Sequence, residues 1–213
     1  TNLLFFIANR LYIYMIPYFY TPYQQGNYIQ AYKIVEYLGV AISFTYYPFI
    51  ALVAESGEKM KDHLLMLVRL SNTVVLIFVL LILSAGRWLF PLLFGPSFDS
   101  MFNIFICFIP GVFAVCSSSF FTAWYFGTGQ IRYNIISACI LLLTMPVSFF
   151  LLGGRTNAAA AALGFSLANL ISLGYDIFIY RKLQPFPVPS MLLSGTGDLR
   201  ILIRLVKRNA FRS

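Results

Sequence analysis

The stretch that decides the fold is LMLVRLSNTVVLIFVLLILSAG, residues 65–86. It is long enough for a helix that crosses a bilayer, which takes about 20 mostly apolar residues, and Arg69 is its only charge. Stretches of the same character fill most of the chain on both sides of it. Six transmembrane helices are therefore predicted, over residues 2–21, 28–54, 65–86, 101–126, 132–153 and 157–180.

The composition supports this prediction. The chain has 213 residues, of which 60% are hydrophobic and 10% charged, whereas a soluble domain has about 25% charged residues. The apolar stretches are continuous and lack the alternation of barrel strands. We expect an all-α, polytopic membrane helix bundle of about six transmembrane helices over residues 1–183, followed by a basic tail over residues 184–213.

The two ends of the chain carry different signals. The first apolar run follows Thr1 directly, without the basic region and cleavage site of a signal peptide. The chain is therefore expected to be a fragment of a longer protein. Residues 198–208 predict an interfacial amphipathic helix with affinity for anionic lipid, and the alternative is a disordered basic tail.

Basic residues are distributed unevenly among the connections. If the helices alternate in direction, only Arg87 and Arg155 fall on one side. Eleven fall on the other: Lys59, Lys61, Arg69, Arg132, Arg181, Lys182, Arg200, Arg204, Lys207, Arg208 and Arg212. Such an excess marks the cytoplasmic face. Both ends are predicted in the cytoplasm, and the net charge of +8 follows from this topology and does not indicate nucleic-acid binding.

Small residues inside the predicted helices indicate how the helices pack, and prolines indicate where they bend. A ridge spaced by four residues predicts close helix approach: Ala160, Gly164, Ala168 and Ser172. Prolines interrupt four of the six helices: Pro17, Pro48, Pro110 and Pro146. Each kinks its helix or supplies a bending point. Four such breaks favour a membrane protein that changes conformation over one that only anchors to the membrane.

The first predicted helix carries a cation in the hydrocarbon region. Arg10, Tyr14 and Tyr18 are spaced by four and share one face. A charge at this depth is costly unless it has a partner or borders a water-filled cavity. With 1.5 Å of rise per residue, Arg10 lies about 16 Å below the outer end of its helix at Thr21.

The second predicted helix offers a matching polar face. Gln30, Lys33 and Tyr37 share this face, and Glu36 lies beside it. Lys33 lies about 9 Å and Glu36 about 13 Å below the outer end of the helix, so Glu36 and Arg10 have similar depths. Two interpretations stay open. Arg10 and Glu36 form a neutralising ion pair, or the cations line a cavity that holds an anionic substrate group.

Other polar residues give weaker signals. Asp176 is predicted to be an interfacial salt-bridge partner of Arg181 and Lys182. The cysteines and the single histidine lack metal-ligand spacing, so neither a metal nor another cofactor is expected. No catalytic constellation is evident, and the chain is not expected to be an enzyme.

An ordered set of motifs resembles a known family. The motifs are Gly26–Tyr32 with Glu36, Tyr47–Ala51, Phe90–Phe98, Pro110–Gly111 and Tyr125–Gln130. Over residues 1–183 they resemble polysaccharide-biosynthesis flippases. These are the Wzx-type O-antigen and teichoic-acid exporters of the multidrug/oligosaccharidyl-lipid/polysaccharide exporter superfamily.

The resemblance implies one half of a MATE-like two-bundle transporter. This half would be C-terminal, in a protein of twelve or more spans. The family moves lipid-diphosphate-linked sugars across the bacterial inner membrane by alternating access between two bundles. The first two helices here would line its central cavity. Family members often carry an acidic residue where Asn9 and Arg10 stand here, so their ion-coupling step does not transfer to this chain.

A role for each polar side chain follows as an expectation. Arg10 and Lys33 would contact the diphosphate or an acidic sugar, Gln30 would also bind the substrate, and Glu36 would act as ion-pair or gating partner. The tyrosines Tyr14, Tyr18 and Tyr37 would stack on sugars. Expected partners are the lipid-linked oligosaccharide, membrane lipids, the missing N-terminal half and other polysaccharide-assembly membrane proteins.

Two other functions are alternatives. A multidrug cation exporter of the same superfamily should have an acidic cavity, whereas this chain offers mainly basic residues. A membrane enzyme acting on the same glycolipids should have a polar catalytic loop, and the predicted outer loops are short.

Overall fold

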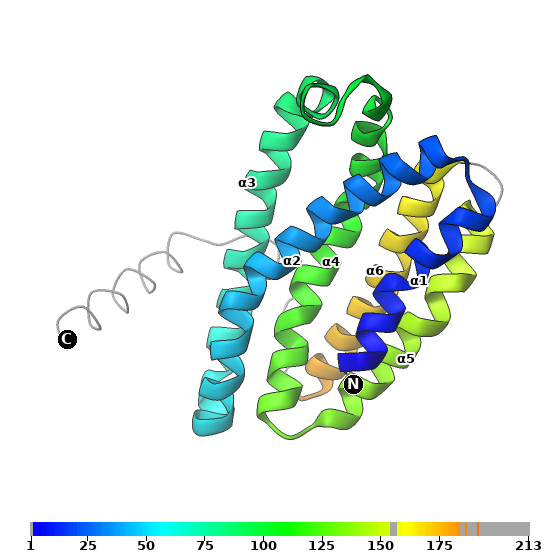
Figure 1. Ribbon diagram of the computed structural model, residues 1–213. Helices are drawn as coiled ribbons and strands as arrows, with labels where there is room; N and C mark the ends of the chain where they lie inside the picture. The colour runs from blue at the N-terminus through cyan, green and yellow to red at the C-terminus, as the bar shows by residue number, and fades with distance from the viewer. Residues whose placement is uncertain (1, 154–156, 184–185, 187–190, 192–213) are drawn as a thin grey trace.

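The protein is a bundle of long helices that run alternately up and down (Figure 1). The computed structural model describes residues 2–153, 157–183, 186 and 191. The long helices are α1 (Asn2–Phe19), α2 (Pro22–Ser56), α3 (Lys61–Phe94), α4 (Met101–Gly127), α5 (Ile131–Ser148) and α6 (Ala158–Leu183). Short helical turns are η1 (Gly57–Met60), η2 (Pro96–Phe98) and η3 (Phe149–Gly153). The predicted all-α helix bundle is confirmed.

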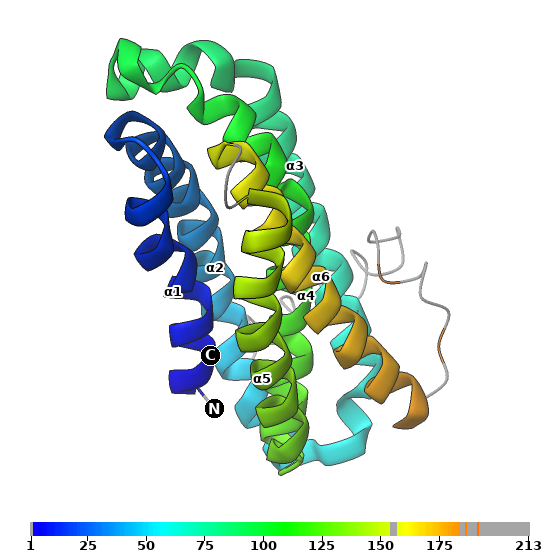
Figure 2. The ribbon, with the colours of Figure 1, turned by 90° about the vertical axis from the view of Figure 1, so that its right-hand side faces the viewer.

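The helices are suited to a membrane. Five of them, α2 to α6, are long and apolar enough to cross one, and α1 is a shorter apolar helix. The α2–α3 and α4–α5 connections lie at one end of the bundle, and the α1–α2 and α3–α4 connections lie at the other (Figures 1 and 2). The chain is therefore a membrane-embedded protein, while its inner-membrane location and the cytoplasmic side stay predictions.

Two predicted boundaries were wrong. Helix α2 begins at Pro22 and not at residue 28, because Thr21 caps it. Thr21 Oγ1 accepts from the Gln24 amide at 3.4 Å, and the Gln24 side chain accepts from the Thr21 amide at 3.3 Å. Helix α3 continues to Phe94, although its end was predicted at residue 86. It ends at Gly95, whose φ of 102° suits glycine.

Helix α4 lies at the centre of the bundle, between α2, α3 and α6. Helix α6 packs closely on it: a Cβ added at Gly111 would lie 2.9 Å from the Ser166 Cα. The predicted small-residue ridge on α6 is confirmed as a packing surface, because Gly164, Ala168 and Ser172 are buried. Figure 2 shows α1 and α2 along one side of the bundle.

Some predictions concern parts of the chain that the structure does not describe. Arg155 lies there, as do the predicted amphipathic helix over residues 198–208 and most of the basic tail. Four prolines were predicted to lie inside helices, and the structure places all four there: Pro17, Pro48, Pro110 and Pro146. The π-helical segment η3 begins three residues after Pro146, so α5 changes its hydrogen-bond pattern near that proline.

Candidate functional site

Arg10 and Glu36 form an ion pair between α1 and α2. Arg10 Nη2 donates to Glu36 Oε1, as their similar predicted depths allow. The Arg10 guanidinium also lies 5.4 Å from the centre of the Phe6 ring, within the range of a cation–π contact. The two charged side chains keep 35% and 33% of their surface exposed, so the pair is reachable from outside.

The ion pair borders a groove of about 450 Å³. Val115 of α4 and Phe165 of α6 contribute apolar surface to it. The groove is lined by Phe5, Phe6, Arg10, Tyr32, Val35, Glu36, Gly39, Val40, Ser43, Tyr47, Val115 and Phe165. We call it the α1–α2 groove. The ion pair and the cavity, which the sequence offered as alternatives, therefore occur together.

The other predicted site residues lie outside this groove. The side chains of Tyr14, Tyr18, Tyr37 and Lys33 are exposed, and Gln30 is half-buried. Lys33 forms no ion pair with any residue that the structure describes. The structure thus brings Arg10 and Glu36 together and leaves the remaining predicted residues on exposed or partly exposed helix surface.

Three polar lining residues of the groove were missed from the sequence. Tyr32, Ser43 and Tyr47 lie on the same face of α2 as Glu36. Their positions differ from Glu36 by four, seven and eleven residues, which is the helical period of one face. This spacing can be read from the sequence, but the polar face predicted for α2 was the neighbouring one that carries Lys33 and Tyr37.

The prediction for Asp176 was wrong. The side chain is 1% exposed, and neither carboxylate oxygen has a hydrogen-bond partner. The expected partners lie elsewhere: Arg181 is exposed, and Lys182 Nζ lies 4.3 Å from the centre of the Phe178 ring. Asp176 is on the face of α6 that packs inward, where a charge at the end of the helix cannot reach it.

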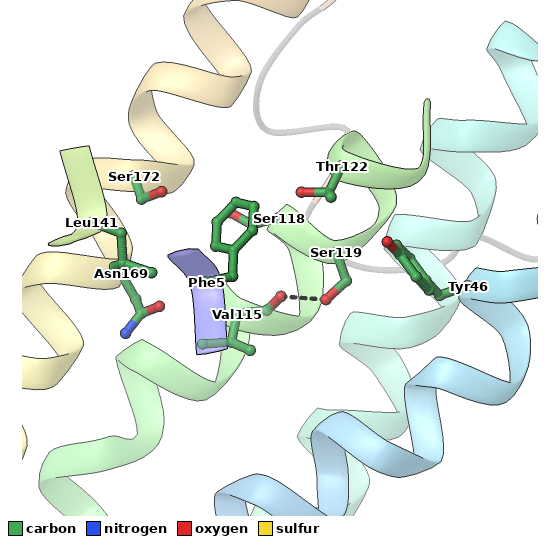
Figure 3. Close-up of a pocket in the computed structure, with 9 residues that line it drawn as sticks. All are labelled: Phe5, Tyr46, Val115, Ser118, Ser119, Thr122, Leu141, Asn169 and Ser172. Carbon is green, nitrogen blue, oxygen red and sulfur yellow. Dashed lines mark hydrogen bonds between the residues drawn. The ribbon is translucent and has the colours of Figure 1, made fainter. Parts of the chain in front are cut away.

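A second cavity, of about 250 Å³, lies beside α4 and α6 (Figure 3). Its polar lining comes mainly from those two helices: Ser118, Ser119, Thr122, Asn169 and Ser172. Phe5 of α1 reaches in among these side chains (Figure 3). Ser119 Oγ donates to the Val115 carbonyl at 2.9 Å, so its hydroxyl is satisfied within its own helix. This polar cavity was not predicted from the sequence.

Comparison of the chain with protein-family models, curated proteins and solved structures found no match.

Proposed function

We propose that this bundle forms one wall of a flippase for a polyprenyl-diphosphate-linked oligosaccharide in the bacterial inner membrane. The observation that carries the proposal is the position of Arg10. Its side chain belongs to an apolar helix yet stays one-third exposed beside the α1–α2 groove. A membrane protein that needed only to neutralise this cation would gain by enclosing it.

Arg10 has the chemistry to hold a diphosphate. A guanidinium carries five N–H donors in a planar fork, and the bond to Glu36 comes from Nη2. The remaining donors can bind phosphate oxygens, which match the spacing of the fork. In this mechanism Glu36 balances the charge when the groove is empty, and the diphosphate takes its place when the cargo enters.

The surroundings of the ion pair suit the rest of the cargo. Tyr32 and Tyr47 line the groove, and aromatic rings offer apolar faces with a polar edge. Tyr14, Tyr18 and Tyr37 are exposed on α1 and α2, outside the groove. Arg10 and the exposed Lys33 are the two cations of α1 and α2, and Glu36 and Glu55 match them in number. The preference for an anionic cargo over the cationic drugs of a multidrug exporter therefore rests on the free donors of Arg10.

The experiment is to replace Arg10 in the full-length protein and measure surface polysaccharide. Arg10→Ala should reduce export about tenfold or more, because a hydrogen bond to a charged group contributes about 1.5–3 kcal/mol. The amount of protein in the membrane should not change. Arg87→Ala is the matched control, since Arg87 is an exposed arginine of α3 far along the chain from the groove.

A double substitution separates cargo binding from simple neutralisation. Arg10→Gln combined with Glu36→Gln removes both charges and leaves no unpaired ion. If Arg10 contacts the diphosphate, the double variant should export as poorly as Arg10→Ala. Normal export by the double variant would show that the pair only balances itself, and the proposed role of Arg10 would be wrong.

A further inference from the structure

Asp176 is a charged group without a visible counter-charge. It lies on α6 with 1% of its surface exposed, and it forms no salt bridge with a described residue. Burying an isolated carboxylate costs several kcal/mol unless the charge is neutralised. A buried group of this kind calls for an explanation, such as an ion or a proton that neutralises it.

Buried oxygen atoms without partners gather at this level of the bundle. Nine buried side-chain oxygen or nitrogen atoms lack a hydrogen-bond partner among the described residues, and four of them belong to Asp176, Ser118 and Asn134. Ser118 and Ser137 lie next to the Asp176 carboxylate, although neither hydroxyl bonds to it in the observed orientation.

The helix register brings α5 to the same place. Ser137 Oγ of α5 is 2.9 Å from Ser172 Oγ of α6. The two helices run in opposite directions (Figure 1), so Asn134, one turn back on α5, lies level with Asp176, one turn forward on α6. Helix α4 joins them, because Tyr125 Oη donates to the Asp176 carbonyl at 2.9 Å.

No described cation neutralises this carboxylate. Tyr125 of α4 and Tyr175 of α6 interact electrostatically with Asp176, and Tyr133 and Arg132 of α5 lie beside Tyr175. Arg132 Nη2 instead donates to the Tyr133 hydroxyl at 2.9 Å, and its guanidinium carbon lies 4.8 Å from the centre of that ring. The positive charge of Arg132 is therefore directed toward Tyr133.

We infer that Asp176, with the side-chain oxygens of Ser118, Ser137 and Asn134, forms a binding site for a monovalent cation, either Na⁺ or a proton. One carboxylate among neutral oxygens carries one negative charge, and hard cations prefer oxygen ligands. The described residues hold no group of three or more His, Cys, Asp or Glu side chains that would suit a multivalent metal.

The neighbouring cavity gives the cation a route. Ser118 lines the cavity of about 250 Å³, and so does Ser172, which lies one helical turn from Asp176. Both side chains are drawn at the edge of that space in Figure 3. A cation that enters among these hydroxyls therefore reaches the carboxylate by passing Ser118. Its binding ties α4, α5 and α6 together at this level of the bundle.

The experiment measures the thermal stability of the purified full-length protein and requires no transport assay. A ligand that binds only the folded state raises Tm with its concentration. For Na⁺, Tm of the wild-type protein should rise by a few degrees as Na⁺ replaces K⁺ at constant ionic strength. For a proton, Tm should fall as the pH is raised from about 5 to about 8. The folded protein then binds a proton that the unfolded chain does not, so the fold loses stability as the pH rises.

Variants assign the effect to the site. Asp176→Asn should remove the Na⁺ or pH response, and Ser118→Ala should shift the half-maximal Na⁺ concentration about tenfold upward, or weaken the pH response. Ser119→Ala is the matched control, because its hydroxyl bonds within α4. An identical Na⁺ and pH response in the wild type and Asp176→Asn would overturn the inference.

As a second readout, a hydrophobic carbodiimide should modify Asp176 in the protonated state. Modification should fall with rising pH and, if the site takes Na⁺, also with added Na⁺ at fixed pH. If Asp176 is modified to the same extent at every pH and Na⁺ concentration, the inference is wrong.

Discussion

Two carboxylates within the helices of this bundle have opposite environments. Glu36 faces a groove, keeps a third of its surface and contacts the guanidinium of Arg10. Asp176 is enclosed by α4, α5 and α6 and has no charged partner among the described residues. The negative charge of Glu36 is neutralised by a cation of the same chain, whereas that of Asp176 would need a bound cation or proton.

The difference follows from how the helices pack. On the α1–α2 side, charged and aromatic side chains remain exposed, as a wall that faces another surface would require. On the α4–α6 side, the helices approach closely through small residues such as Gly111 and Gly164. The comparison predicts that substitutions on the α4–α6 side chiefly change stability, whereas those on the α1–α2 side change function with little effect on stability.

The largest expected effect is on the α4–α6 side. A Cβ at Gly111 would meet the Ser166 Oγ at 2.8 Å and its Cα at 2.9 Å. Gly111→Ala should therefore push α6 away from α4 and lower the free energy of unfolding by about 1–3 kcal/mol. The measurement is unfolding in mixed micelles.

Gly174→Ala is the matched control for this prediction. A Cβ at Gly174 has no atom within 4 Å, and both substitutions gain the same helix propensity. Gly174→Ala should leave the stability unchanged or raise it slightly. Equal stability of the two variants would contradict the close α4–α6 packing and weaken the contrast between the two sides.

A smaller effect is expected where α1 joins the packed side. The Tyr12 and Ser148 hydroxyls are 2.9 Å apart and connect α1 to α5. Tyr12→Phe should lower the free energy of unfolding by about 0.6 kcal/mol, the average for an interhelical hydrogen bond in a membrane. Tyr14→Phe removes an exposed hydroxyl and should have no effect. Tyr12 lies in the buried core with Ala8 and Ile16, so a loss of several kcal/mol in Tyr12→Phe would mean that its hydroxyl contributes far more than an average interhelical hydrogen bond and would contradict this prediction.

Much of the fold was predictable because lipid imposes a simple rule. Each spanning segment must satisfy its own backbone and be apolar over about 20 residues, so the long helices were found from composition and length. The Arg10–Glu36 pair was also predictable, since helical rise alone fixes the relative depth of two residues on adjacent helices.

The parts of the candidate sites that were not predicted depend on which face each helix turns toward the bundle interior. Nothing local to Asp176 distinguishes an inward position from one near the bundle surface, and its neighbours Ser118, Asn134 and Ser137 come from two other helices. The exposure of Tyr14, Tyr18 and Tyr37 likewise depends on how α1 and α2 tilt against the bundle. Two helix ends had a local cause: Thr21 caps the start of α2, and α3 continues past Gly86 and through Pro91 until Gly95.

The smallest expected effect concerns Lys33 and tests the α1–α2 side directly. Lys33 is exposed and has no ion-pair partner among the described residues, so Lys33→Gln should change the free energy of unfolding by less than about 0.5 kcal/mol. Glu36→Gln is the matched comparison. It leaves the Arg10 guanidinium without its carboxylate and should cost about 1 kcal/mol at most, because the pair is one-third exposed and screened by solvent. If Lys33→Gln is the more destabilising of the two, Lys33 has a structural partner, and the α1–α2 face would be a packed interface and not an open wall.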